Sequence, residues 1–124
     1  MRLQVAIAFI GALITATEVS AGAPAWEFVY RPTKAEYVLY GGFLGDTVPP
    51  TKGDSKISLL ISGSAARDMF NALGPDQPDA CGADASTRVR EKEDISCLRY
   101  SSKNYVCYVG LDLKTGKSIG GVIC

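Results

Sequence analysis

The chain has 124 residues, enough for one domain. It carries 13 basic and 13 acidic residues, so its formal net charge is zero. A neutral chain gives no sign of the basic patch with which proteins bind nucleic acid or of the polybasic segment that attaches to anionic lipid, so we expect neither partner. It also lacks histidine, which removes the usual general base and the commonest metal ligand.

The first 21 residues are predicted to be a secretory signal peptide. Arg2 precedes an almost wholly apolar stretch over residues 5–16, and Val19-Ser20-Ala21 fits the pattern of a cleavage site. The stretch is shorter than the roughly 20 residues of a spanning helix, which argues against a membrane anchor. We therefore expect cleavage after Ala21, one exported domain over residues 22–124, and a periplasmic or secreted protein with no anchor.

The early part of the chain contains three predicted strands. Residues 26–30 alternate aromatic side chains with others, and Arg31-Pro32 ends this strand. Residues 36–40 form a second short strand that Gly41-Gly42 ends, and residues 45–54 are predicted to be a loop. Residues 56–62 form the clearest strand, because every second side chain is Ile or Leu on one face.

One helix of about ten residues is predicted, with Ser64 as its N-cap. Gly74 is expected in the left-handed position after the helix, and Pro75 prevents continuation. An apolar stripe at helical spacing is expected to pack on a sheet. It consists of Ala66, Met69, Phe70 and Leu73.

The last third of the chain is predicted to be a three-stranded antiparallel meander, with strands over residues 95–100, 105–113 and 118–124. Residues 75–86 are predicted to be a loop, and 87–94 either an edge strand or a solvated turn. The middle strand carries an inward-facing row by period two. Its members are Tyr105, Cys107, Val109, Leu111 and Leu113.

Four cysteines in an exported chain of this size predict two disulfides. The first hairpin places Cys97 opposite Cys107. The second, centred on Thr115-Gly116, places Cys107 opposite Cys124 and Val109 opposite Val122. We favour Cys97–Cys107 with Cys81–Cys124; Cys81–Cys97 with Cys107–Cys124 remains an alternative.

These elements predict an α+β fold. We expect a small antiparallel sheet, made of the C-terminal meander and one or two N-terminal strands, with one short helix packed on a face and two disulfides.

No catalytic residue can be chosen from the sequence. Lys114-Thr115-Gly116 matches one element of the penicillin-interacting enzymes, but the partner elements are missing, so we interpret it as a hairpin turn. The spacing of Asp76, Asp79 and Asp84 matches no calcium loop. We expect neither a metal nor a cofactor.

Six aromatic residues within a short stretch are the candidate binding residues, because aromatic side chains are enriched at interface hot spots. They are Trp26, Phe28, Tyr30, Tyr37, Tyr40 and Phe43. The competing interpretation, that these side chains form the core, is favoured in so small a domain.

We expect an exported, non-catalytic binding protein, such as an inhibitor or immunity-type protein, whose partner is another exported or envelope protein. One alternative is a small hydrolase, which predicts a cleft with two carboxyl groups, one with a raised pKa. The other is an accessory subunit of an envelope complex, which predicts a large exposed apolar face.

Overall fold

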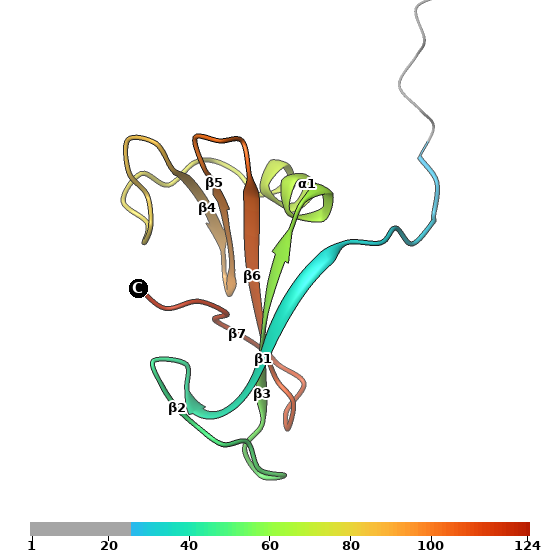
Figure 1. Ribbon diagram of the computed structural model, residues 1–124, viewed down its shortest axis with the longest axis vertical. Coiled ribbons are helices and arrows are strands. Elements are labelled where there is room, and N and C mark those ends of the chain that lie inside the picture. The colour runs from blue at the N-terminus through green and yellow to red at the C-terminus, as the bar shows by residue number, and fades with distance from the viewer. Residues whose placement is uncertain (1–25) are drawn as a thin grey trace, which may run out of the picture. The chain divides into compact units, whose positions relative to one another are not determined.

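The computed structural model describes residues 26–124, and Arg31–Cys124 form one compact unit (Figure 1). Met1–Tyr30 are a second unit, of which the structure describes residues 26–30. The predicted signal peptide, residues 1–21, lies outside the described residues.

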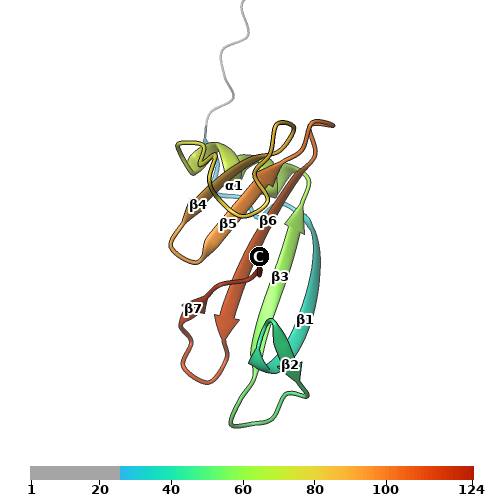
Figure 2. The same cartoon turned by 90° about the vertical axis from the view of Figure 1, so that its left-hand side faces the viewer.

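Seven strands form one antiparallel sheet in the order β2-β1-β3-β6-β5-β4, and β7 pairs with β6 beyond the end of β5 (Figures 1 and 2). One helix packs on this sheet, so the α+β fold class is confirmed. The strands are β1 (Lys34–Phe43), β2 (Asp46–Val48), β3 (Lys56–Ser62), β4 (Arg88–Lys92), β5 (Ile95–Arg99), β6 (Tyr105–Asp112) and β7 (Ser118–Ile119), and the helix is α1 (Ser64–Ala72).

The N-terminal strands differ from those expected. Residues 26–30 are not in a strand, so that prediction is wrong. β1 begins at Lys34 and continues through Gly41-Gly42, and the predicted loop contains the short strand β2. The two glycines bend β1 instead of ending it, because Gly42 has a φ of 70° and donates its N–H to Asp54. Of the two alternatives for residues 87–94, the edge strand is observed as β4.

α1 begins one residue earlier than expected. Gly63, not Ser64, is the N-cap, and no side chain caps the helix start. Gly63 has a φ of 74°, a conformation that glycine adopts at little cost and that turns the chain from β3 into α1. The predicted stripe is confirmed: Ala66 and Phe70 are fully buried, and Met69 and Leu73 are partly buried against the core.

Arg90 of β4 holds the other end of α1. Its Nη1 donates to the carbonyls of Phe70 and Leu73, both at 2.9 Å, and its guanidinium carbon lies 4.3 Å from the centre of the Phe70 ring. The side chain of Asp76 accepts hydrogen bonds from Arg90 and Arg88. The prediction of a left-handed Gly74 is wrong, because a side chain from the sheet satisfies the last carbonyls instead.

The core under α1 contains a disulfide. Cys97 and Cys107 lie directly opposite each other on β5 and β6 and are bonded, as predicted, and both are fully buried beside Ala66 and Phe70. The expected inward row on β6 continues only in part. Tyr105 packs edge-on against Phe70, but Leu113, past the end of β6, is 50% exposed.

The C-terminal segment covers the opposite face of the sheet, and Figure 1 shows it across β6 from α1. The predicted strand over 118–124 is wrong beyond Ile119, and β7 pairs Ile119 with Gly110 instead of Val122 with Val109. Gly121 explains the departure. Ser58 donates to its carbonyl at 2.6 Å, and a Cβ there would lie 2.7 Å from the backbone carbon of Val109.

The second disulfide, Cys81–Cys124, joins this C-terminal segment to the loop between α1 and β4, which confirms the favoured pairing. The same loop lies against Leu98 of β5, since a Cβ on Gly82 would be 3.2 Å from its Cδ2. The disulfide therefore links two irregular segments that contact the same face. Two disulfides are typical of proteins that fold in an oxidising compartment.

Phe70→Ala is expected to reduce the free energy of unfolding by about 3–5 kcal/mol, because it empties the centre of the core under α1. Urea denaturation of the oxidised protein measures this loss. Asn71→Ala, the exposed neighbour, is the control and should change stability by no more than about 0.5 kcal/mol. A loss for Phe70→Ala as small as that of the control would contradict the packing.

The Asp76 cluster predicts a dependence of stability on pH. Hydrogen bonds from Arg88 and Arg90 lower the Asp76 pKa from 3.8 to about 2. Its ionised form therefore stabilises the fold above pH 4, and this contribution is lost as the pH falls through 2. Asp76→Asn should be less stable than wild type at pH 7 and should lose less stability between pH 4 and pH 2. Denaturant titrations at several pH values test this, and an Asp76→Asn profile as steep as that of wild type between pH 4 and pH 2 would contradict it.

Candidate functional site: an unpaired edge on β1

Among residues 26–124, no strand lies beside the outer edge of β1 over most of its length. β2 pairs only with Gly41, Gly42 and Phe43, so residues 34–40 have β3 on one side and, in this part of the chain, no strand on the other. The backbone N–H and C=O groups of alternate residues point to opposite sides of a strand. Half of the groups in this stretch therefore point away from the sheet.

The residues that point outward follow from the hydrogen bonds of the neighbouring strands. The Gly42 N–H donates to Asp54, on the β3 side of β1, at 2.7 Å. Alternation then directs the backbone groups of even-numbered residues toward β3 and those of Ala35, Tyr37 and Leu39 outward. No backbone hydrogen bond within residues 26–124 and outside the sheet ladders involves these three residues.

The pairing of β5 with β6 leads to the same assignment of the backbone groups that point outward from β1. The Cα atoms of Cys97 and Cys107 are only 4.1 Å apart, which is the spacing of a non-hydrogen-bonded antiparallel pair. Leu113, odd-numbered like Cys107, donates its N–H to Ser55, the residue before β3. Odd residues of β6 therefore bond to β3, and even residues of β3 bond to β1.

The opposite edge of the sheet, β4, is protected. Gln77 donates its backbone N–H to Val89 at 2.8 Å and its side-chain amide to Glu91 at 2.9 Å. The β4 residues themselves are mostly charged, which is how natural proteins prevent edge-to-edge association. Along residues 35–39 of β1, no group from the described part of the chain closes the edge in this way, and Glu36 is the single charged residue.

Exposed apolar side chains accompany the unpaired edge. Tyr37 is 69% exposed, and Val38 and Leu39 are about half exposed. α1 packs against β3, β5 and β6 and leaves the face of β1 that carries Tyr37 and Leu39 uncovered. Apolar groups gathered on one exposed strand mark an interaction site more often than scattered ones do.

A shallow groove runs beside β1 on the other face of the sheet. Its volume is about 260 Å³, and its walls are formed by Glu36, Tyr37, Val38, Ser58, Leu60 and Tyr108. Burial raises the pKa of the Tyr108 hydroxyl, so that side chain remains neutral across the physiological range. The groove therefore combines apolar side chains with hydroxyl groups and the Glu36 carboxyl group, next to backbone donors and acceptors that have no partner among residues 26–124.

The structure separates the six candidate aromatic residues. Tyr40 is buried, with 2% of its surface exposed, so the core interpretation holds for it. Tyr37 and Phe43 are exposed on β1, at 69% and 82%. Trp26, Phe28 and Tyr30, in the other unit, are also exposed, and the Phe28 ring centre lies 6.3 Å from that of Trp26 and 5.8 Å from that of Tyr30. The favoured core interpretation is therefore wrong for five of the six.

Val38, Leu39, Leu60 and Tyr108 are site residues that the sequence reasoning missed. One signal was present, since β1 carries apolar side chains at both odd and even positions, which a half-buried strand does not need. Whether such side chains are buried or exposed depends on which strand lies beside them, and that information is not local.

Three carboxyl groups have structural roles. The Asp84 side chain accepts from the backbone N–H groups of Ser86 and Thr87 and closes a turn. Hydrogen bonds from Gly42 and then Lys56 lower the pKa of Asp54, and those from the arginines lower the pKa of Asp76. A general acid at neutral pH needs a raised pKa, so these groups do not supply the chemistry of the alternative hydrolase. Within residues 26–124 no cluster of three or more acidic or cysteine residues is placed to hold a metal.

The Lys114-Thr115-Gly116 sequence forms the predicted turn. Asp112 accepts hydrogen bonds from the backbone N–H groups of Lys114 and Thr115, and Gly116 has a φ of 72°. This conformation is the reason for the glycine, because it closes the hairpin between β6 and β7.

Comparison with protein-family models, with curated proteins and with solved structures finds no match for this chain. Within residues 26–124, no helix is long and apolar enough to cross a membrane.

The alternating direction of the backbone N–H groups along β1 predicts an alternation in their hydrogen-exchange rates. The amides of Glu36 and Val38, which face β3, should exchange at least about tenfold more slowly than those of Tyr37 and Leu39. Residue-resolved exchange followed by NMR measures the difference. Equal protection of all four amides would show that this edge is already covered.

Proposed function

We propose that this protein is a non-catalytic binding protein whose β1 edge accepts an extended segment of another protein. The observation that carries the proposal is the contrast between the two sheet edges. β4 is closed by Gln77 and bordered by charges, whereas the outward groups of Ala35, Tyr37 and Leu39 have no partner among residues 26–124.

Strand addition suits this geometry because the backbone supplies the affinity and the neighbouring side chains supply the specificity. A strand added to β1 would hydrogen-bond to Ala35, Tyr37 and Leu39. On one face its alternate side chains would contact Tyr37 and Leu39, and on the other they would enter the groove beside Val38, Leu60 and Tyr108. The partner segment is therefore extended and apolar on both faces.

We also propose that the protein works in an oxidising compartment. The two disulfides and the predicted signal peptide favour a periplasmic or secreted protein, so the partner is another exported or envelope protein. Such an edge suits an inhibitor or immunity-type protein and a subunit of an envelope complex equally well.

The test is selection from a display library of random ten-residue peptides on the oxidised domain. We expect enriched peptides with apolar residues at consecutive or alternate positions. Bound peptide should slow the hydrogen exchange of Ala35, Tyr37 and Leu39 and leave the β4 amides unchanged.

Tyr37→Pro removes an outward N–H without removing a bond to β3, so it should abolish peptide binding and retain the fold. Because proline also restricts the backbone of β1, Val38→Lys is a second variant, which places a charge in the groove and leaves the backbone unaltered. Lys92→Gln on β4 is the control and should bind like wild type.

Two results would overturn the proposal. One is the absence of any enriched peptide that protects β1. The other is sedimentation showing a wild-type dimer that Tyr37→Pro dissociates, because the edge would then belong to a second copy of this chain.

A further inference from the structure

The two disulfides lie in different surroundings. Cys97 and Cys107 are fully buried on adjacent strands under α1, where the Cys107 sulfur lies 3.3 Å from the carbonyl oxygen of Ala66. Cys81 and Cys124 are both exposed, and neither belongs to a helix or strand. Thiol–disulfide exchange requires a thiolate to reach a disulfide sulfur, so its rate depends on access. Access therefore distinguishes the second disulfide from the first.

The two chain segments that the exposed disulfide joins are irregular. Cys81 lies in the loop between α1 and β4, and Cys124 ends the C-terminal segment, residues 120–124, which follows β7. Among residues 26–124, no backbone hydrogen bond outside the sheet ladders involves residues 120–124. The disulfide is therefore one of few attachments that hold the C-terminal segment in place.

The other main attachment is Gly121. A Cβ on this residue would lie 2.7 Å from the backbone carbon of Val109, so the two backbones are in direct contact. Ser58 of β3 donates its hydroxyl to the Gly121 carbonyl at 2.6 Å. The next two residues, Val122 and Ile123, are 38% and 56% exposed, so the end of the segment is only loosely packed. Without the disulfide, local release of this segment would break few contacts.

The C-terminal segment also limits the groove beside β1. Ser58, which binds the segment through its hydroxyl, is one of the residues that line the groove. In the sheet, Ser58 lies between Val38 of β1 and Gly110 of β6. Gly110 is buried, and the backbone of Gly120 lies against it. Release of the segment would therefore lengthen the groove across β3 toward Gly110.

We infer that Cys81–Cys124 is a site of thiol–disulfide exchange, whose opening releases the C-terminal segment from the sheet and leaves the domain folded. The substrate class is a low-molecular-weight thiol. Its thiolate attacks one sulfur, a mixed disulfide forms, and the other cysteine leaves as a thiolate. A second thiol attacks the mixed disulfide, so that two thiols become one disulfide and the protein gains two thiol groups after protonation.

The rest of the domain has its own attachments. The core under α1 retains the Cys97–Cys107 disulfide, which a thiol reaches only when the core opens. The loop that carries Cys81 is also held by Gln77, which donates its backbone N–H to Val89 at 2.8 Å. The half-reduced protein therefore keeps its sheet, its helix and the β1 edge.

The first experiment measures which cysteines exchange. The native oxidised domain is incubated with reduced glutathione, and mass spectrometry after alkylation locates the mixed disulfides and the new thiols. Cys81 and Cys124 should react at least about tenfold faster than Cys97 and Cys107, because the buried pair requires an opening of the core. Equal rates for the two pairs would overturn the inference.

The second experiment tests the attachment of the C-terminal segment. Because Ser58 holds the segment on the sheet, Ser58→Ala should shift the equilibrium with glutathione about fivefold toward the opened form, the effect of one lost hydrogen bond. Ser102→Ala, in the exposed turn between β5 and β6, is the matched control and should behave like wild type. An equal equilibrium in the two variants would show that opening does not release the segment.

The third experiment uses the variant Cys81→Ser, Cys124→Ser, which corresponds to the opened form. Its ¹⁵N NMR spectrum should be that of a folded domain, with faster hydrogen exchange at Gly121 and unchanged exchange at Cys97 and Cys107. The spectrum of an unfolded chain would contradict the inference. Peptides selected on the β1 edge should shift the Gly110 amide signal in this variant and not in wild type, and an unshifted signal would exclude the lengthened groove.

The lengthened groove rests on the proposed function, whereas the exchange reaction does not. Selective reaction of Cys81 and Cys124 without any β1 peptide would leave the exchange site standing and overturn the proposed function. Peptides that protect β1, together with unselective reaction of all four cysteines, would overturn the exchange site and leave the proposed function standing.

Discussion

The pairing of β3 with β6 is the constraint on which the rest of the structure depends. It runs from Lys56 opposite Asp112 to Ser62 opposite Val106 and joins the N-terminal strands to the C-terminal meander. With these two strands in the centre, β1 and β4 lie toward opposite edges of one sheet. The positions of the core, the helix and the candidate binding edge all follow from that single ladder.

The two faces of this sheet are covered in different ways. α1 covers one face through Ala66 and Phe70, and the buried Cys97–Cys107 disulfide lies under it. The other face is covered in part by the C-terminal segment, which lies close to β6 through Gly121 and is linked to the loop after α1 by Cys81–Cys124. Both coverings lie over the middle strands, so β1 retains exposed apolar side chains. A small domain has too few elements to cover every strand.

Exposure of β1 matters because an unpaired apolar edge is a liability unless a partner occupies it. The protein protects β4 with Gln77 and with charges, so the chemistry for closing an edge is present in the same molecule. The exposed side chains on both faces of β1 and the groove beside Val38 and Leu60 give the edge a defined shape. These features together favour one kind of partner over general adhesion.

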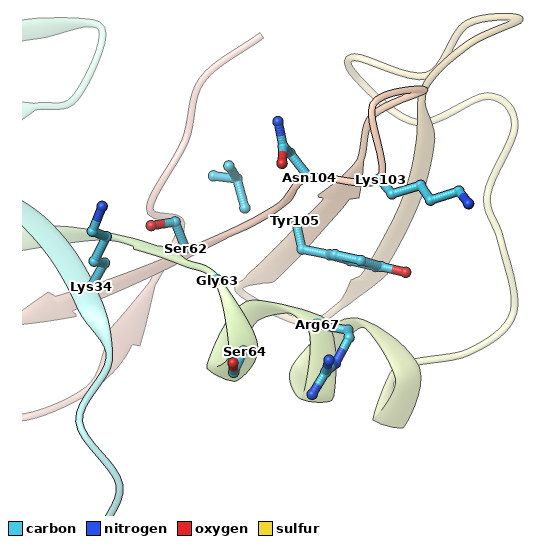
Figure 3. Close-up of a pocket in the computed structure, with 9 residues that line it drawn as sticks. Lys34, Ser62, Gly63, Ser64, Arg67, Lys103, Asn104 and Tyr105 are labelled. Carbon is cyan, nitrogen blue, oxygen red and sulfur yellow. The ribbon is translucent and has the colours of Figure 1, made fainter.

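The local pattern determined the strand over 56–62, the apolar stripe of α1 and the Cys97–Cys107 register, because each depends on periodicity or short turns. It favoured the observed disulfide pairing without deciding it, because the predicted second hairpin also placed Cys107 opposite Cys124. Only the tertiary structure decided which aromatic residues are buried and which are exposed. Tyr40 and Tyr37 lie on different faces of β1, and those faces differ in what covers them. The tertiary structure also decided the end of α1, where Arg90 of a distant strand replaces a glycine cap, and the path of residues 120–124. The cavity that Lys34, Arg67 and Lys103 line (Figure 3) was equally beyond the sequence, because these residues come from three elements whose positions depend on the β3–β6 pairing.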